Sequence, residues 1–181
     1  MKIIDLDPSE KEMSQQVAKL LVEGFKEVAP NAWSDMTSAV KEVHRSFADD
    51  RISRIAVEGD VVVGWIGGIK QYDGNVWELH PLVVHPDHRR KGIGRALVSD
   101  LESLVRERGG ITLWAGTDDE SDMTSICGID LYPDVLKKLM EIKNVRGHPY
   151  EFYLKLGFEI VGALPDANGF GKPDIFVAKR V

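Results

Sequence analysis

The feature that most constrains the fold of this 181-residue chain is a strand, a basic glycine-containing loop and an amphipathic helix in direct succession. Residues 76–84 have the pattern of a long strand, and a helix is expected from about Gly92 to Arg108. Its apolar residues recur at three- and four-residue spacing on one face, and Gly109-Gly110 ends it. A helix of this kind buries its apolar face on a sheet, so the segment predicts an α/β fold.

A proline stands inside the expected strand. Pro81 has no backbone N–H and cannot donate to a sheet ladder. The strand should therefore bulge or lose its pairing near this position, and a bulge offers a free backbone N–H nearby. Glu78 and His80 are two residues apart, so their side chains should project from the same face of the strand.

Two helices and two hairpins surround this core segment. Ser9 and Glu12 have the spacing of a capping box at the start of one helix, and Ser34 is placed to cap the next. Gly59-Asp60 and Asp73-Gly74 are typical hairpin turns. The other expected elements are strands at about residues 2–6, 55–58, 61–71, 111–117, 158–164 and 175–179, and helices at 131–143 and 150–156. We expect one domain over residues 1–181 with a mixed sheet, because no stretch reads as a linker.

Composition argues against several classes of function. The formal net charge is −6, whereas a nucleic-acid partner usually requires a basic face. Cys127 is the only cysteine, so an intrachain disulfide or a cysteine-based zinc site cannot form, and it reads as an ordinary small residue. The first residues are too acidic for a signal peptide, and no apolar stretch reaches the roughly 20 residues of a membrane helix. We expect a cytoplasmic protein without a membrane or nucleic-acid partner.

The loop before the long helix concentrates positive charge around two glycines. Its residues are His88, Arg89, Arg90, Lys91, Gly92, Gly94 and Arg95. Glycine lets a backbone approach a ligand closely, and the first N–H groups of a helix have no internal partner. These properties suit a pyrophosphate group, although a solvated basic helix start would look the same. The pattern is neither a Walker loop nor the dinucleotide pattern G-x-G-x-x-G, because Leu97 stands at its third glycine.

The string Arg89-Arg90-Lys91-Gly92-Ile93-Gly94 resembles the R/Q-x-x-G-x-G/A signature of the GNAT superfamily of N-acetyltransferases. The stretch His148–Phe158 is similar to a late helix of that family with the pattern FY-x-K-x-GF. Residues 77–84, 116–119 and 169–174 resemble bacterial aminoglycoside 6'-N-acetyltransferases. This second similarity covers about residues 60–181.

The resemblance implies a fold and a co-substrate. It implies a central twisted mixed sheet of about six to seven strands, flanked by helices and splayed around an acetyl-CoA site. Leu82 would polarise the acetyl carbonyl through its N–H, and Val84 would pair with the pantetheine arm. The cofactor-binding residues that the resemblance implies are Leu82, Val83, Val84, Arg89, Arg90, Lys91, Gly92, Ile93, Gly94, Arg95 and Tyr153.

Acetyl transfer also needs acid–base groups. Glu78 is the candidate base, directly or through a water, although an exposed carboxylate on an alternating strand would look the same. The resemblance places Tyr153 near the coenzyme thiol, where it would hold or protonate the thiolate; an aromatic packing residue is the alternative. His80 is a candidate for positioning water or substrate, or a packed core histidine. The histidines lack metal-ligand spacing, so we expect no metal.

Carboxylates mark a candidate acceptor site. Glu78, Asp118, Asp119 and Asp174 are the expected substrate-binding residues. Residues 118–122 follow a strand end and would attract a polyamine, although most charge runs are simply solvated loops. Gly171 stands where close relatives would carry a further acidic residue.

The sequence thus predicts an enzyme that acetylates a primary amine, with the 6'-amino group of an aminoglycoside as acceptor and antibiotic resistance as the consequence. A polyamine, a peptide N-terminus or a lysine is the alternative acceptor. A non-catalytic acyl-CoA-binding module is the alternative of another class. The family often forms homodimers, for which residues 175–179 are a candidate contact.

Overall fold

The computed structural model describes residues 1–26, 29 and 31–181. The chain divides into two compact units, which are considered separately below. The first unit contains Met1–Leu113 and Val181, and the second contains Trp114–Arg180. A single domain over residues 1–181 stays a prediction.

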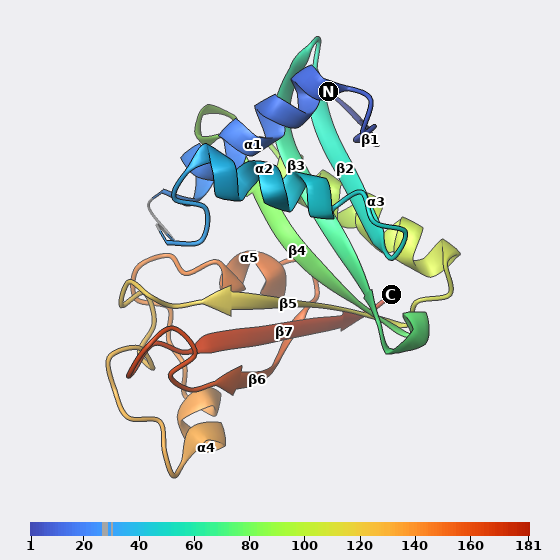
Figure 1. The fold of residues 1–181 in the computed structure, drawn as a ribbon. Helices are drawn as coiled ribbons and strands as arrows, with labels where there is room; N and C mark the ends of the chain where they lie inside the picture. The colour runs from blue at the N-terminus through green and yellow to red at the C-terminus, as the bar shows by residue number, and fades with distance from the viewer. Residues whose placement is uncertain (27–28, 30) are drawn as a thin grey trace. The chain divides into compact units, whose positions relative to one another are not determined.

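The first unit carries four strands that pair with one another in chain order. They are β1 (Lys2–Asp5), β2 (Arg51–Glu58), β3 (Val61–Gln71) and β4 (Val76–Val84) (Figure 1). Every pair is antiparallel. Both expected hairpin turns are confirmed, because Gly59-Asp60 joins β2 to β3, and a short 3-10 turn at Tyr72–Gly74 joins β3 to β4.

Helices cover both faces of this four-stranded sheet. The helices α1 (Lys11–Phe25) and α2 (Met36–Arg45) lie on one face, where Leu21 packs in one apolar cluster with Trp65 and Val83. The helix α3 (Ile93–Glu107) lies on the other face, and a Cβ at Gly68 would approach Leu101 of this helix to 2.8 Å. The expected long helix after the basic loop is therefore confirmed.

The helix caps differ from those expected. Glu10 is the N-cap residue of α1 and makes no side-chain cap, while the Ser9 hydroxyl donates to Asp7 at 2.6 Å; the capping-box prediction was wrong. At α2 the Asp35 carboxylate accepts the N–H of Ser38 at 2.7 Å, so Ser34 is not the cap. At α2 the neighbouring aspartate takes the place expected for the serine, whereas at α1 Asp7 accepts the hydrogen bond of the Ser9 hydroxyl and no side chain caps the helix.

The bulge expected at Pro81 is present in β4. Ile66 pairs with Leu82 and Gly68 pairs with Leu79, so His80 and Pro81 together oppose Gly67. A Cβ at Gly67 would overlap the His80 carbonyl, which means that only glycine leaves room for this bulge. The extra residue also reverses the alternation of side chains along the strand. Leu79 shares the α3 face with its partner Gly68, whereas Val83, four positions later, lies on the α1 face.

The second unit carries three strands and two short helices. Its strands are β5 (Thr112–Asp118, which begins in the first unit), β6 (Glu159–Leu164) and β7 (Asp174–Arg180), in the order β5-β7-β6. Its helices are α4 (Val135–Met140) and α5 (Tyr150–Leu154). The helix α4 is shorter than the expected 131–143, because Pro133 disfavours helical geometry in the residue before it.

The α/β class is confirmed. The described residues form seven strands, within the expected six to seven, and helices flank the strands of the first unit. The last strand β7 lies between β5 and β6. Its backbone therefore already pairs on both sides, and it cannot add a partner's strand along its own edge.

Candidate active site

The basic loop between β4 and α3 presents free backbone donors; we call residues 89–95 the anion loop. Arg90 and Gly92 have positive φ angles of 61° and 85°, and α3 begins directly afterwards at Ile93. Among the residues that the structure describes, the amide N–H groups of 90–95 make no hydrogen bond, and the first bonded amide is that of Ala96. The positive end of the helix dipole adds to these donors. The loop therefore has the donors that hold a pyrophosphate.

Arg89 anchors this loop with its side chain. Its Nη2 donates to the carbonyl of Gly24 at 2.9 Å, near the end of α1, and its Nε donates to the carbonyl of Val84 at 3.4 Å. The Arg89 amide donates to Pro86 within the preceding 3-10 turn, Pro86–His88. Arg89 thus holds the loop in place, while the side chains of Arg90, Lys91 and Arg95 are exposed. A direct role of any of them in cofactor binding stays a prediction.

Glu78 and His80 lie on one face of β4, as expected. The imidazole of His80 lies 5.7 Å from the ring of Trp33, which in turn lies 4.6 Å from Phe25 of α1. This places Glu78 and His80 on the face that α1 and α2 cover. Glu78 is half-buried, and its Oε2 accepts a hydrogen bond from Nε2 of Gln71 at 2.7 Å.

The residues after the bulge present their amides to the outer side of β4. The His85 amide donates to Val63 of β3, and Val83 pairs with Trp65. Successive N–H groups of a strand point to opposite sides. The amides of Leu82 and Val84 therefore point away from β3, which is the orientation that binding the acetyl carbonyl and the pantetheine arm would need. Both roles stay predictions.

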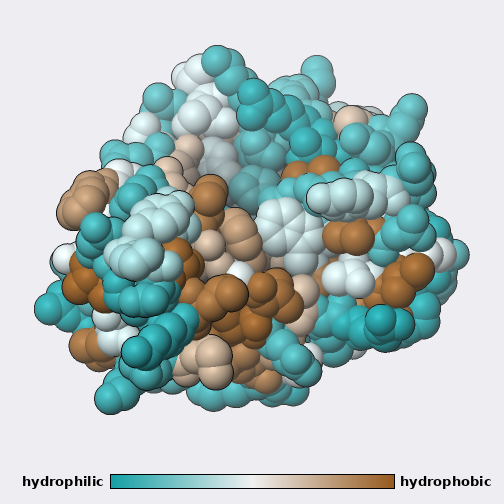
Figure 2. All heavy atoms as spheres, turned by 90° about the horizontal axis from the view of Figure 1, so that it is seen from below, coloured by the Kyte–Doolittle hydropathy of each residue, from teal (hydrophilic) through white to brown (hydrophobic). Residues whose placement is uncertain are grey.

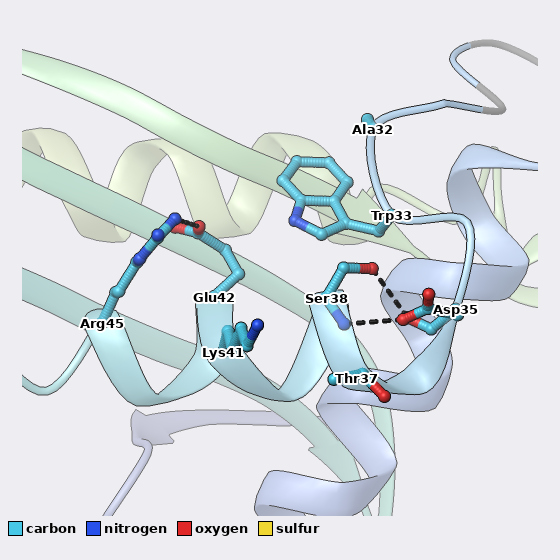
Figure 3. Close-up of a pocket in the computed structure, with 8 residues that line it drawn as sticks. All are labelled: Ala32, Trp33, Asp35, Thr37, Ser38, Lys41, Glu42 and Arg45. Atoms are coloured by element: carbon cyan, nitrogen blue, oxygen red, sulfur yellow. Dashed lines mark hydrogen bonds and ion pairs between the residues drawn. The ribbon is translucent and has the colours of Figure 1, made fainter.

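Trp33 also lines a pocket of about 280 Å³ along α2. The residues around it are Ala32, Trp33, Asp35, Thr37, Ser38, Lys41, Glu42 and Arg45 (Figure 3). Figure 3 shows the indole above the helix, with the Asp35 carboxylate held by Ser38 and the Arg45 guanidinium beside Glu42. Trp33 thus contributes both to this pocket and to the surroundings of His80. Sequence reasoning did not select it.

In the second unit, Tyr153 is buried on α5. Its ring packs edge-on against Phe152 and Phe158, with centroid distances of 5.2 and 5.4 Å. Burial raises the pKa of the Tyr153 phenol far above its ordinary value, so the side chain keeps its proton at neutral pH. A protonated phenol can hold a leaving thiolate by donating a hydrogen bond, whereas its raised pKa makes it a weak proton donor. The role of Tyr153 stays a prediction.

The acidic segment is committed to its own loop; we call residues 118–124 the acidic loop. Asp119 is fully buried, and its two carboxylate oxygens accept the amides of Met123 and Thr124 at 2.9 and 2.7 Å. The carboxylate of Asp118 accepts Nδ2 of Asn168 at 2.5 Å. The Asp119 carboxylate is thus buried and hydrogen-bonded within its own loop. Direct contact with an acceptor substrate would require it to give up these hydrogen bonds.

Asp174 lies over the neighbouring strand β5. A Cβ at Gly116 would stand 2.7 Å from Oδ2 of Asp174, so glycine makes room for the carboxylate. Gly171, where an acidic residue was expected in close relatives, has a φ of 72°, and a Cβ there would press on the backbone of Gly128 at 3.2 Å. The local backbone thus suits glycine at both positions.

A buried histidine supports the acidic loop. His148 is 1% exposed; its Nδ1 accepts the amide of Tyr150 at 3.2 Å, and its Nε2 lies 3.1 Å from the carbonyl of Asp118. The ring is therefore neutral, with its proton on Nε2, and burial lowers the pKa of His148 despite the nearby aspartates. His148 joins the end of β5 to the start of α5, which carries Tyr153. Nothing in the sequence around His148 indicates this supporting role.

Other groups in the described parts of the chain limit the chemistry. No group of three or more His, Cys, Asp or Glu side chains there is placed to hold a metal ion. No helix there has the length and apolar character needed to cross a membrane. Burial raises the pKa of the Cys127 thiol to about 11, so it stays protonated and unreactive at neutral pH.

Comparison with known proteins identifies the family. A profile of the Acetyltransferase (GNAT) family matches residues 15–127. Two curated relatives are the acetyltransferases SG1711 of Sodalis glossinidius and ECA0875 of Pectobacterium atrosepticum, with 45% and 43% identity over 53 residues. These matches span about a third of the length of either relative, 35% and 36%.

Solved structures match almost the whole chain. One is an aminoglycoside 6'-N-acetyltransferase in complex with coenzyme A, with 43% identity, a TM-score of 0.91, and coverage of 99% of this chain and 97% of that one. Another is the aminoglycoside 6'-N-acetyltransferase from Enterococcus faecium, with 43% identity over the same shares and a TM-score of 0.88. The expected fold, enzyme class and acetyl-CoA co-substrate are confirmed at the level of the family. This chain therefore belongs to the GNAT family of acetyltransferases.

Proposed function

We propose that this protein transfers an acetyl group from acetyl-CoA to a primary amine, and that the acceptor is the 6'-amino group of an aminoglycoside. The observation that carries the donor half is the row of free amides at residues 90–95. The acceptor half is supported by the two structures of aminoglycoside 6'-N-acetyltransferases at 43% identity over nearly the whole chain.

The donor occupies the anion loop and the outer side of β4. Its pyrophosphate accepts the amides of the loop, while Arg90, Lys91 and Arg95 add positive charge. The amide of Val84 pairs with the pantetheine arm, and that of Leu82 donates to the acetyl carbonyl. A donor at the carbonyl stabilises the negative charge that the oxygen gains during attack.

The reaction then needs two proton movements. Glu78 removes a proton from the acceptor ammonium, directly or through a water, and the freed nitrogen lone pair attacks the thioester carbon. The carbon–sulfur bond breaks, and the departing thiolate is held by a hydrogen bond from the Tyr153 phenol, which burial keeps protonated. The second proton of the attacking nitrogen passes to the thiolate. The products are the acetylated amine and the coenzyme thiol. His80, beside Glu78, orients the acceptor together with Trp33.

Carboxylates attract the cationic acceptor. Glu78 supplies negative charge in the first unit, and Asp118 and Asp174 supply it in the second, where Asp119 holds the shape of the acidic loop around Asp118. An aminoglycoside carries several ammonium groups, so such a field concentrates it near the site.

A cytoplasmic location, homodimerisation and a role in antibiotic resistance stay predictions. Exposed apolar side chains gather on one face (Figure 2), and Leu136 and Met140 of α4 are among those exposed in the second unit.

Replacing Glu78 with glutamine tests the base. In the Glu78→Gln variant we expect kcat to fall at least about 100-fold, because the amide cannot accept the proton, while coenzyme affinity is unchanged. The measurement is thiol release from acetyl-CoA with an aminoglycoside present, together with calorimetric titration of the coenzyme. Glu159→Gln, an exposed glutamate on strand β6, is the matched control and keeps wild-type activity. Equal losses of rate and coenzyme affinity in Glu78→Gln would remove Glu78 as the base.

A further inference from the structure

We propose that Gln71 is the positioning residue for Glu78. Its amide fixes one oxygen of the Glu78 carboxylate and leaves the other oxygen to take the proton of the acceptor amine. This inference rests on the proposed function, in which Glu78 is the base, and it adds a residue that the sequence did not single out.

The hairpin between β3 and β4 brings the two side chains together. Gln71 is the last residue of β3 and pairs with Val76, while Glu78 pairs with Ile69. Gln71 and Glu78 are thus diagonal neighbours on the same face of two antiparallel strands, where long side chains reach one another. The tight turn at Tyr72–Gly74 fixes this register. The resulting distance from Nε2 of Gln71 to Oε2 of Glu78 is 2.7 Å.

The chemistry of the pair is asymmetric. A carboxylate only accepts hydrogen bonds, so the glutamine must present its NH2 group to Glu78. The amide carries no charge, so it orients the carboxylate without neutralising it as a lysine or arginine would. In the described part of the chain, Oε2 has this bond, and no hydrogen bond or ion pair involves Oε1 of Glu78. The arrangement therefore leaves one defined oxygen for proton transfer.

Loss of the amide changes the position of the base. The Glu78 side chain gains rotamer freedom, so its reactive oxygen spends less time in the productive position. This change does not touch the anion loop, which lies beyond the other end of β4. The effect should appear in kcat, and coenzyme binding should be unaffected.

The experiment replaces Gln71 with methionine, which has nearly the same length and no N–H donor. We expect kcat at neutral pH to fall about tenfold while the KM for acetyl-CoA keeps its wild-type value, because only the orientation of the base changes. The control is Gln16→Met. Gln16 lies on α1, and its side-chain amide hydrogen-bonds the backbone of Asp60 and Val62 at the far end of β3. We expect this control to keep the wild-type kcat and the wild-type KM for acetyl-CoA.

Two further variants keep the test decisive. Gln71→Glu puts a second carboxylate beside Glu78, so it should lower kcat more than Gln71→Met does. In the Glu78→Gln background, Gln71→Met should cause no further loss, since the two residues act as one unit. An unchanged kcat in a folded Gln71→Met protein, with Glu78→Gln impaired, would overturn the positioning role. An active Glu78→Gln enzyme would instead overturn the proposed function.

Discussion

The anion loop and the acidic loop are both charged segments that follow strand ends, but they differ in whether their backbone amides are hydrogen-bonded. The amides of residues 90–95 make no hydrogen bond within the described chain. In the acidic loop, the amides of Met123 and Thr124 both bind the carboxylate of Asp119, whose own amide binds Pro173. The first loop keeps its amide donors available, whereas the second binds its amide donors internally.

This difference indicates which loop binds and which loop supports. A free donor at a helix start offers binding energy to an anion, because no internal bond has to be broken. A buried carboxylate that accepts two amides stabilises its loop, and losing it leaves those amides unpaired. Changes in the anion loop should therefore lower coenzyme affinity, and changes at Asp119 should lower the free energy of unfolding.

The largest effect is expected from Asp119→Ala. The substitution removes the two carboxylate oxygens that accept hydrogen bonds from two amides of the loop, so the free energy of unfolding should fall by about 3 kcal/mol. Urea unfolding followed by circular dichroism measures this loss. Asp118→Ala is the neighbouring control; it loses the one exposed hydrogen bond from Asn168 and should cost less than about 1 kcal/mol. An Asp119→Ala protein with wild-type stability would break the distinction between the two loops.

Gly92→Val should mainly affect the coenzyme. Gly92 has a φ of 85°, which valine avoids, so the free loop relaxes and must be strained again to present its amides. Coenzyme affinity, measured by calorimetry, should fall roughly 10- to 100-fold. Gly109→Val is the matched control at the other end of α3, with a φ of 79° and equal space around a Cβ. Equal affinity losses in the two variants would show that the anion loop has no special role.

The smallest effect is a pH dependence carried by His148. The unfolded chain takes up a proton near the ordinary histidine pKa of about 6.5, whereas burial lowers the pKa of His148 in the folded protein. Its contribution to stability is therefore complete above pH 6.5 and is lost progressively as the pH falls below that value. The free energy of unfolding, measured from pH 7.5 to 5.5, should fall more steeply in the wild type than in His148→Gln, by at most about 1.4 kcal/mol per pH unit. Parallel curves would contradict this role.

Patterns that depend on neighbours along the chain allowed much of the fold to be predicted. The hairpin turns and the helix after the anion loop follow from local turn and helix signals, and the bulge follows from the missing N–H of Pro81. The caps were less predictable, because Asp35 caps α2 in place of Ser34, and the Ser9 hydroxyl donates to Asp7. Local structure can therefore be predicted where a single residue determines it, as Pro81 does for the bulge.

The site was predicted where a motif carries it and missed where only the fold creates it. The free amides of the anion loop were expected from Gly92 and Gly94 at a helix start. The inward position of the Asp119 carboxylate was not readable, because its partners are backbone amides that any residue supplies. Gln71 was within reach of sequence reasoning, since the Asp73-Gly74 turn places it diagonally opposite Glu78 once the register is known.

The most direct test of the central claim is the choice of acceptor. Thiol release from acetyl-CoA is compared for a kanamycin-type aminoglycoside, its analogue with a hydroxyl in place of the 6'-amine, a polyamine and a lysine peptide. We expect the highest kcat/KM with the 6'-amino compound and no acetylation of the 6' position in the hydroxyl analogue. Preference for the polyamine or the peptide would contradict the proposed acceptor. Coenzyme binding without thiol release for any amine would contradict the proposed enzyme.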